Sequence, residues 1–253
     1  MKSTYIKKIL SSDNFVEKAI GYLIKNPVKI LQISDIRSYL SSVSTNHKIS
    51  NGEVKTINSD SAIIGTVEHN YNGLKNLAGF DRGSILVNTF LSLYREILPE
   101  EARFLSIGPR NECELYSIIS HGINPEQIYG IDLISSDPFV ISGDMHQMPF
   151  EDNFFETIFV GWVLAYSNDL AKACAEIVRV ARNDAYIIIG CDFNGFQYTD
   201  KGVLDEKYGT FNNTDDIFNL FGELVGEKII QRNARFPYND TERKIVAGFK
   251  LKK

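Results

Sequence analysis

Three short apolar segments in the middle of the chain are each followed by a residue that could help to hold a nucleoside. Gly108 follows the first segment, Asp132 ends the second, and Asp144 comes after the third. A glycine turn between a strand and a helix exposes backbone amides to polar groups, and a carboxylate that ends the next strand can accept hydrogen bonds from ribose hydroxyls. The spacing therefore predicts a nucleoside-binding site.

The elements around these residues predict an α/β fold. Strands are expected at 103–107, 127–132, 138–142, 156–161, 185–191, 227–234 and 243–251, with helices at 84–98, 111–121, 168–182 and 214–224. This alternation is typical of a Rossmann-like, doubly wound, seven-stranded and mostly parallel sheet, and the last two strands suit an antiparallel hairpin. Ligands of such sheets bind beyond the carboxyl ends of the strands. We therefore expect Gly108, Asp132, Asp144 and the pair Gly161-Trp162 around one crevice.

The first third of the chain has a different pattern. Residues 1–42 predict short helices, whereas residues 41–61 are rich in Ser, Asn and Thr and predict a mobile loop or hinge with a turn at Asn51-Gly52. We therefore divide the chain into an N-terminal helical extension or lid, residues 1–82, and an α/β domain, residues 83–253.

Bulk composition excludes several classes of protein. The net charge is −5 and the pI is about 5.5, and no basic stripe indicates a nucleic-acid partner. The three cysteines are widely spaced and form neither a disulfide framework nor a metal site, so we predict no metal and a reducing, cytoplasmic location. No apolar run approaches the length of a membrane span, so we expect a soluble protein without a membrane partner.

A family resemblance rests on the run from Gly143 to Ile158, on Trp162-Val163-Leu164 and on residues 175–180. In combination these segments resemble class I S-adenosylmethionine-dependent methyltransferases, in particular their small-molecule, methyltransferase-11-like branch. The resemblance covers residues 103–192 well and the last 60 residues loosely. It implies S-adenosylmethionine as the cofactor and S-adenosylhomocysteine as its product.

The resemblance also implies roles for individual residues. Asp132 would accept the ribose hydroxyls, Asp144 would accept the adenine amino group, and Leu133 and Met145 would enclose the base. Trp162 could form a wall of the substrate pocket or pack in the core. The residues that we expect at the cofactor are Ser106, Gly108, Pro109, Arg110, Asp132, Leu133, Gly143, Asp144, Met145, Gly161 and Trp162.

The first motif departs from the family pattern. Where the family has Asp/Glu-x-Gly-x-Gly-x-Gly, residues 106–112 read Ser-Ile-Gly-Pro-Arg-Asn-Glu. Arg110 could bind the cofactor's carboxylate or form a structural salt bridge. Glu112 or Glu114 could replace the lost acid as partner of the cofactor's amine, or each could simply favour the start of the following helix.

Two residues are candidates for the chemistry. Methyl transfer from a sulfonium needs close approach of a nucleophile, and a hydroxyl acceptor gains from a base that removes its proton. His146 is the first candidate for that base. Tyr166, where many relatives have a histidine, is a poor base with its ordinary pKa of about 10, so we expect it to orient the acceptor.

The acceptor must be inferred from the variable regions. Residues 192–212 mix aromatic and amide side chains, which suit a small polar molecule. The variant first motif resembles methyltransferases of bacterial surface-polysaccharide biosynthesis, so the expected reaction is O-methylation of a sugar, a nucleotide-linked sugar or a phospho-type precursor. Two alternatives stay open: an inactive scaffold that partners an active paralogue, and a nicotinamide-dependent oxidoreductase. Whether the N-terminal helices form a lid or a homodimer interface also stays open.

Overall fold

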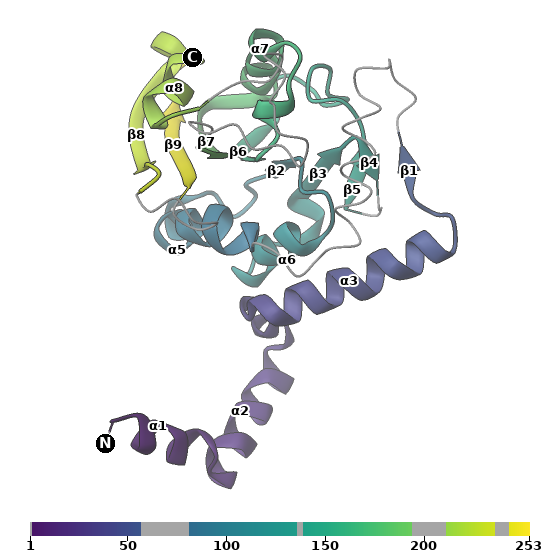
Figure 1. Cartoon of the computed structure of the whole chain (residues 1–253), viewed down its shortest axis with the longest axis vertical. Coiled ribbons are helices and arrows are strands. Elements are labelled where there is room, and N and C mark those ends of the chain that lie inside the picture. Colours follow the sequence, from purple (N-terminus) through teal and green to yellow (C-terminus); the bar gives the residue numbers. More distant parts are fainter. Residues whose placement is uncertain (1, 57–80, 136–138, 194–210, 236–242) are drawn as a thin grey trace.

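The computed structural model describes residues 2–56, 81–135, 139–193, 211–235 and 243–253 (Figure 1). The seven-stranded sheet has the order β5-β3-β2-β6-β7-β9-β8. The first five strands of this order are parallel to one another, and β9 runs antiparallel to both β7 and β8. The strands are β2 (Phe104–Ile107), β3 (Ile128–Asp132), β5 (Val140–Ser142), β6 (Phe155–Gly161), β7 (Ala181–Asp192), β8 (Val225–Arg232) and β9 (Lys244–Leu251). The predicted doubly wound fold with its antiparallel C-terminal hairpin is confirmed. It is a Rossmann-like fold.

Helices cover both faces of this sheet. On one face lie η2 (Gly83–Asn88), α5 (Thr89–Tyr94), η3 (Arg95–Ile97) and α6 (Cys113–Ser120), and on the other lie α7 (Leu170–Val180) and α8 (Thr214–Asn219). Successive strand residues point to opposite faces. In β6, for example, Phe159 packs with the first helix layer, whereas its neighbours Ile158 and Val160 pack with the second. Both faces are therefore buried, as a parallel sheet requires.

The predicted helix at 84–98 is continuous in the chain but changes its hydrogen-bonding pattern. It begins as a π-helical segment, η2, continues as α5 and ends as the 3-10 segment η3. Phe90 and Leu91 are buried against the sheet as expected. The apolar spacing of this segment also predicts that Ile97 faces inwards, and this prediction is wrong, because Ile97 lies in the last turn and is 64% exposed.

The N-terminal region consists of α1 (Lys2–Leu10), α2 (Asp13–Lys25), η1 (Pro27–Gln32) and α3 (Ser34–Ser50). Of these, η1 and α3 pack on α6, whereas α1 and α2 project from the body of the molecule (Figure 1). The prediction of a mobile loop that begins at residue 41 is wrong for residues 41–50, because these residues are helical. The predicted turn at Asn51-Gly52 is confirmed, and Gly52 has a φ of +68°.

Arg37 fastens this region to the α/β domain. Its guanidinium group is fully buried and donates hydrogen bonds to the carbonyl oxygen of Leu31 at 2.7 Å, to Asp81 at 2.6 Å and to the hydroxyl of Ser84 at 3.0 Å. A second tie is a two-stranded antiparallel sheet between β1 (Lys55–Thr56) and β4 (Ile134–Ser135). Within the described ranges, no helix is both long enough and apolar enough to span a bilayer.

Candidate active site

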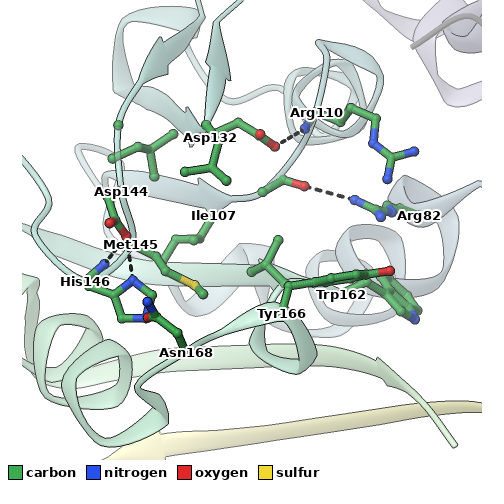
Figure 2. A pocket seen from close by; sticks show the side chains of 15 residues that line it. Arg82, Ile107, Arg110, Asp132, Asp144, Met145, His146, Trp162, Tyr166 and Asn168 are labelled. Carbon is green, nitrogen blue, oxygen red and sulfur yellow. Dashed lines mark hydrogen bonds and ion pairs between the residues drawn. The ribbon is translucent and has the colours of Figure 1, made fainter. Parts of the chain in front are cut away.

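A pocket opens at the carboxyl ends of β2, β3, β5 and β6, where the strand order reverses (Figure 2). This is the place that a doubly wound sheet predicts for its ligand. The residues that line the pocket are Arg82, Ile107, Gly108, Arg110, Ile131, Asp132, Leu133, Gly143, Asp144, Met145, His146, Trp162, Val163, Tyr166 and Asn168.

Asp132 ends β3 in the pocket wall and is held by backbone donors. The amide of Arg110 donates to Oδ2 at 2.9 Å, and the amide of Ile134 donates to Oδ1 at 3.3 Å. Burial raises the pKa of the Asp132 carboxyl, and these two hydrogen bonds oppose the rise. The carboxylate is therefore fixed in position with little solvent around it, which strengthens its hydrogen bonds to a ligand.

The turn after β2 keeps the backbone shape of a glycine-rich loop although only one glycine remains. Gly108 has a φ of +76°, and a Cβ atom there would lie 2.0 Å from Cγ1 of Val163. Arg110, at the position of the family's second glycine, also adopts a left-handed conformation, with a φ of +63°. For a residue with a Cβ atom this conformation costs about 1–2 kcal/mol.

A second arginine, which the sequence analysis did not select, joins Arg110 in the pocket wall. Nη1 of Arg82 donates to the carbonyl oxygen of Gly108 at 2.9 Å, and its guanidinium carbon lies 5.6 Å from the centre of the Trp162 ring. Burial and then the positive charge of Arg82 lower the pKa of Arg110, while the Asp132 carboxylate opposes the change. Figure 2 shows both guanidinium groups at the end of the pocket away from Asp144 and His146.

At that opposite end, three side chains form a hydrogen-bonded chain. Oδ1 of Asp144 lies 2.6 Å from Nδ1 of His146, and Nε2 of His146 lies 2.8 Å from the hydroxyl oxygen of Ser167. An ionised carboxylate only accepts hydrogen bonds, so Nδ1 carries a proton. In the neutral form of the ring, Nε2 is then an acceptor for the Ser167 hydroxyl. Oδ1 of Asp144 also accepts from the amide of His146 at 2.8 Å, which leaves Oδ2 for a donor on a ligand.

Trp162 combines the two roles that the sequence left open. It lines the pocket, but its side chain is largely buried, and its Nε1 donates to Asp192 at 2.9 Å. The ring fits because residue 190 is a glycine, whose added Cβ would lie 2.7 Å from the indole. Tyr166, at the end of η5 (Leu164–Tyr166), also lines the pocket and is 44% exposed.

Three of the residues expected at the cofactor lie outside the pocket lining: Ser106, Pro109 and Gly161. The hydroxyl of Ser106 instead donates to the buried carboxyl of Glu114, which lies against Gly161. Glu112 is also buried and forms an ion pair with Lys48 of α3. Neither glutamate lines the pocket.

Other lining residues were missed in the sequence. Ile107 and Ile131 come directly before Gly108 and Asp132, so their place at the strand ends was a usable signal. Arg82 gave no signal, because it falls at the end of the segment interpreted as an extension. Most of the loop expected to line the acceptor site, residues 194–210, falls outside the described part of the chain.

The strand order and a pocket with one acid after β3 and another after β5 agree with the resemblance to class I S-adenosylmethionine-dependent methyltransferases. The family comparison agrees, since residues 113–189 match the model of the family described as "Methyltransferase domain". The chain thus contains a segment that is similar to a methyltransferase domain. No curated protein matches the sequence.

Similar solved structures have low sequence identity. A SAM-dependent methyltransferase from Aquifex aeolicus is 16% identical, with 70% of this chain and 95% of that one covered and a TM-score of 0.44. One from Thermotoga maritima is 18% identical, with 76% and 97% covered and a TM-score of 0.47. The N-methyltransferase NodS from Bradyrhizobium japonicum WM9, in complex with S-adenosylhomocysteine, is 14% identical, with 68% and 86% covered and a TM-score of 0.47.

Proposed function

We propose that this methyltransferase O-methylates a small polar acceptor such as a sugar, a nucleotide-linked sugar or a phospho-type precursor. The main support is the state of His146, whose Nδ1 proton is committed to Asp144 and whose Nε2 therefore accepts. An accepting imidazole nitrogen at the pocket suits removal of a proton from a hydroxyl. The pathway that we propose, bacterial surface-polysaccharide biosynthesis, rests on the resemblance of the first motif alone.

The residues present fit the cofactor. We propose that Asp132 accepts the ribose hydroxyls, that Oδ2 of Asp144 accepts the adenine amino group, and that Leu133 and Met145 enclose the base. Gly143 keeps the wall open there, because a Cβ atom at this position would lie 2.6 Å from the side chain of Ile131. Arg110 would bind the cofactor's carboxylate with its guanidinium group.

The remaining residues expected at the cofactor would shape the pocket wall or support it from behind. Gly108 allows the close turn, and Pro109 fixes the backbone between Gly108 and Arg110. We propose that Ser106 and Gly161 support the site indirectly, since both contact the buried carboxyl of Glu114. Trp162 would form the floor beneath Arg82.

When bound, the cofactor supplies an electrophilic methyl group on its sulfonium. We propose that His146 takes the proton of the acceptor hydroxyl at Nε2, in the place where Ser167 now donates. Asp144 would hold the ring in the required tautomer and favour its protonated form. Tyr166, with its side chain at the pocket mouth, would orient the acceptor by a hydrogen bond.

The variant His146→Asn tests the role of the base. The asparagine amide can still donate to Asp144 but offers no basic nitrogen to the acceptor. We expect turnover to fall by about 10²-fold or more, in the range of general base catalysis, while the Kd for S-adenosylhomocysteine changes by less than about twofold. The assay measures S-adenosylhomocysteine formation with a panel of sugars, sugar phosphates and nucleotide sugars.

Ser167→Ala is the matched control for this test. It frees Nε2 of His146 without removing the base, so turnover should be retained. If His146→Asn keeps full turnover, the base is another group or none is used. If both variants weaken S-adenosylhomocysteine binding equally, the hydrogen bonds among Asp144, His146 and Ser167 serve only to position the carboxylate of Asp144 that binds adenine.

We also propose that residues 1–82 form an extension of the α/β domain of residues 83–253, and that α1 and α2 pair with a second copy of the chain. Of the 17 large hydrophobic side chains that are exposed in the described residues, 14 lie between Tyr5 and Val43. No residue of α2 is buried. Helices of this length are marginal in water unless they pack on something, and a second copy is always available.

Charge also supports this pairing. Residues 2–29 contain six lysines and two acidic residues, whereas the whole chain has a net charge of −5. The projecting helices α1 and α2, which together form the arm, are thus basic, and the rest of the chain is acidic. The arm of one copy is therefore attracted to the body of another. Arg82, the last residue of the extension, lines the pocket, which supports the expectation that the extension acts as a lid.

We propose a cytoplasmic location for the protein. The three cysteines are free, and two of them, Cys174 and Cys191, are buried. Burial raises the pKa of the Cys174 thiol to about 11, so this side chain behaves as an apolar core residue. A reducing compartment suits these free thiols.

A further inference from the structure

The two guanidinium groups at one end of the pocket come from distant parts of the chain. Arg82 precedes η2 and Arg110 lies in the turn after β2, yet both line the same cavity. The carbonyl of Gly108 accepts a hydrogen bond from Nη1 of Arg82, and the amide of Arg110 donates to Asp132. The turn after β2 therefore fixes both cations relative to the predicted ribose acid.

Holding these cations together costs free energy in two ways. Arg110 adopts a left-handed conformation in a position where the family has glycine. Burial, and after it the positive charge of Arg82, also lowers the pKa of Arg110. Backbone strain and repulsion between like charges thus occur together in one wall of the pocket. A bound anion would compensate them, so they point to an anionic ligand.

The charges of the pocket indicate which ligand carries that anion. Among the lining residues, the positive charges of the two arginines balance the negative charges of the two aspartates, Asp132 and Asp144. The bound cofactor has one carboxylate, one ammonium and one sulfonium group, so it adds one net positive charge. With the cofactor in place the pocket has a net charge of one positive unit. This charge is available to an anionic group of the acceptor.

Arg82 is the better placed of the two cations for the acceptor. Its guanidinium group lies over the ring of Trp162, at the end of β6, on the side of the pocket formed by Tyr166. The hydrogen bond to Gly108 uses Nη1, which leaves Nε and Nη2 of the guanidinium fork. A flat fork of this kind suits the paired oxygens of a phosphate or carboxylate.

We propose that Arg82 binds an anionic group of the methyl acceptor, a phosphate or a carboxylate, and restricts the enzyme to anionic acceptors. This inference rests on the proposed function, in which Arg110 binds the cofactor's own carboxylate. The surplus positive charge next to Trp162 excludes neutral sugars as good substrates and favours sugar phosphates, nucleotide-linked sugars and acidic sugars.

The test measures binding of small anions to the protein saturated with S-adenosylmethionine, with inorganic phosphate and acetate as probes and neutral glucose as the control. We expect saturable binding of phosphate or acetate and none of glucose. In Arg82→Met the binding of the anion should weaken by at least about fivefold, while the Kd for S-adenosylhomocysteine changes by less than about twofold. Arg82→Lys keeps the charge and should retain part of the anion binding.

Arg110→Gly provides the opposite control. This variant restores the family's glycine and removes the cation, so S-adenosylhomocysteine binding should weaken while anion binding at saturating S-adenosylmethionine persists. The proposal is overturned if the loaded wild-type protein binds neither anion, or if Arg82→Met and Arg82→Lys weaken S-adenosylhomocysteine without affecting the anion. Failure of the proposed function would look different, because the wild-type protein would then not bind S-adenosylhomocysteine at all.

Discussion

Glu114 lies in the first turn of α6 with its carboxyl group buried between Ser106 and Gly161. The family has an acid at the position of Ser106, so in this chain a carboxyl group reaches the same place from the following helix. The sequence showed the loss of the acid and offered Glu112 and Glu114 as substitutes. The sequence could not distinguish Glu112 from Glu114. Residues two apart on a helix point to different sides, and the sequence does not show which side faces the sheet.

The pH dependence of stability should reveal this buried group. Burial raises the pKa of Glu114, and the hydrogen bond from Ser106 opposes the rise. A carboxyl group with a raised pKa in the folded state binds its proton more tightly there, so stability falls as pH rises from the ordinary value of 4.5 towards the raised value. Glu114→Gln keeps the acceptor for Ser106 but removes the charge.

We therefore expect the melting temperature of Glu114→Gln, relative to wild type, to increase from pH 4.5 to pH 8. Thermal unfolding measured across this range checks the prediction. A constant difference between the two proteins would mean that Glu114 has an ordinary pKa.

At the scale of elements, α3 shows why part of the fold could not be predicted. Its buried face consists of Arg37, Ser41 and Thr45, which are spaced four residues apart but are polar. Apolar periodicity is the main signal for a helix in a sequence, and here the face that packs on the domain lacks it. The central strands β2, β3 and β6 were predictable because they are apolar on both faces, and the sites at their ends followed from the topology.

Arg37 makes the packing of α3 testable. Replacing it with alanine leaves Asp81 without its cation and breaks the hydrogen bonds to Leu31 and Ser84. Loss of one partner of a buried ion pair typically costs about 3–5 kcal/mol. Urea unfolding of Arg37→Ala should show a loss in this range.

The exposed Arg235 provides the control, because Arg235→Ala should change stability by less than about 0.5 kcal/mol. A similarly small effect for Arg37→Ala would show that α3 does not depend on this contact.

For the whole molecule, the division between an arm and a body explains where exposed apolar surface gathers. Figure 1 shows α1 and α2 outside the body that contains the sheet. The sequence predicted short helices in residues 1–42 but not the lack of contacts of α1 and α2, since periodicity shows that a face must be covered and not what covers it. Likewise, Arg82 could be located in the pocket only when the chain was folded.

The arm predicts a dimer that single substitutions can disrupt. Ile20→Glu places a charge on the apolar face of α2, where Ile20 is 52% exposed, and should convert a dimer into a monomer in light scattering. Leu93→Glu is the matched control, because Leu93 is 74% exposed on α5, outside the arm. A wild-type protein that is monomeric at all concentrations would contradict the pairing.

The most direct measurement is calorimetric titration of the wild-type protein and Asp132→Ala with S-adenosylmethionine, S-adenosylhomocysteine and NAD separately. We predict micromolar binding of the first two ligands to the wild type and no binding of NAD. Binding to Asp132→Ala should be at least tenfold weaker, which corresponds to about 1.4 kcal/mol. If neither S-adenosyl compound binds, or if the affinity of Asp132→Ala is unchanged, the account of this pocket is contradicted.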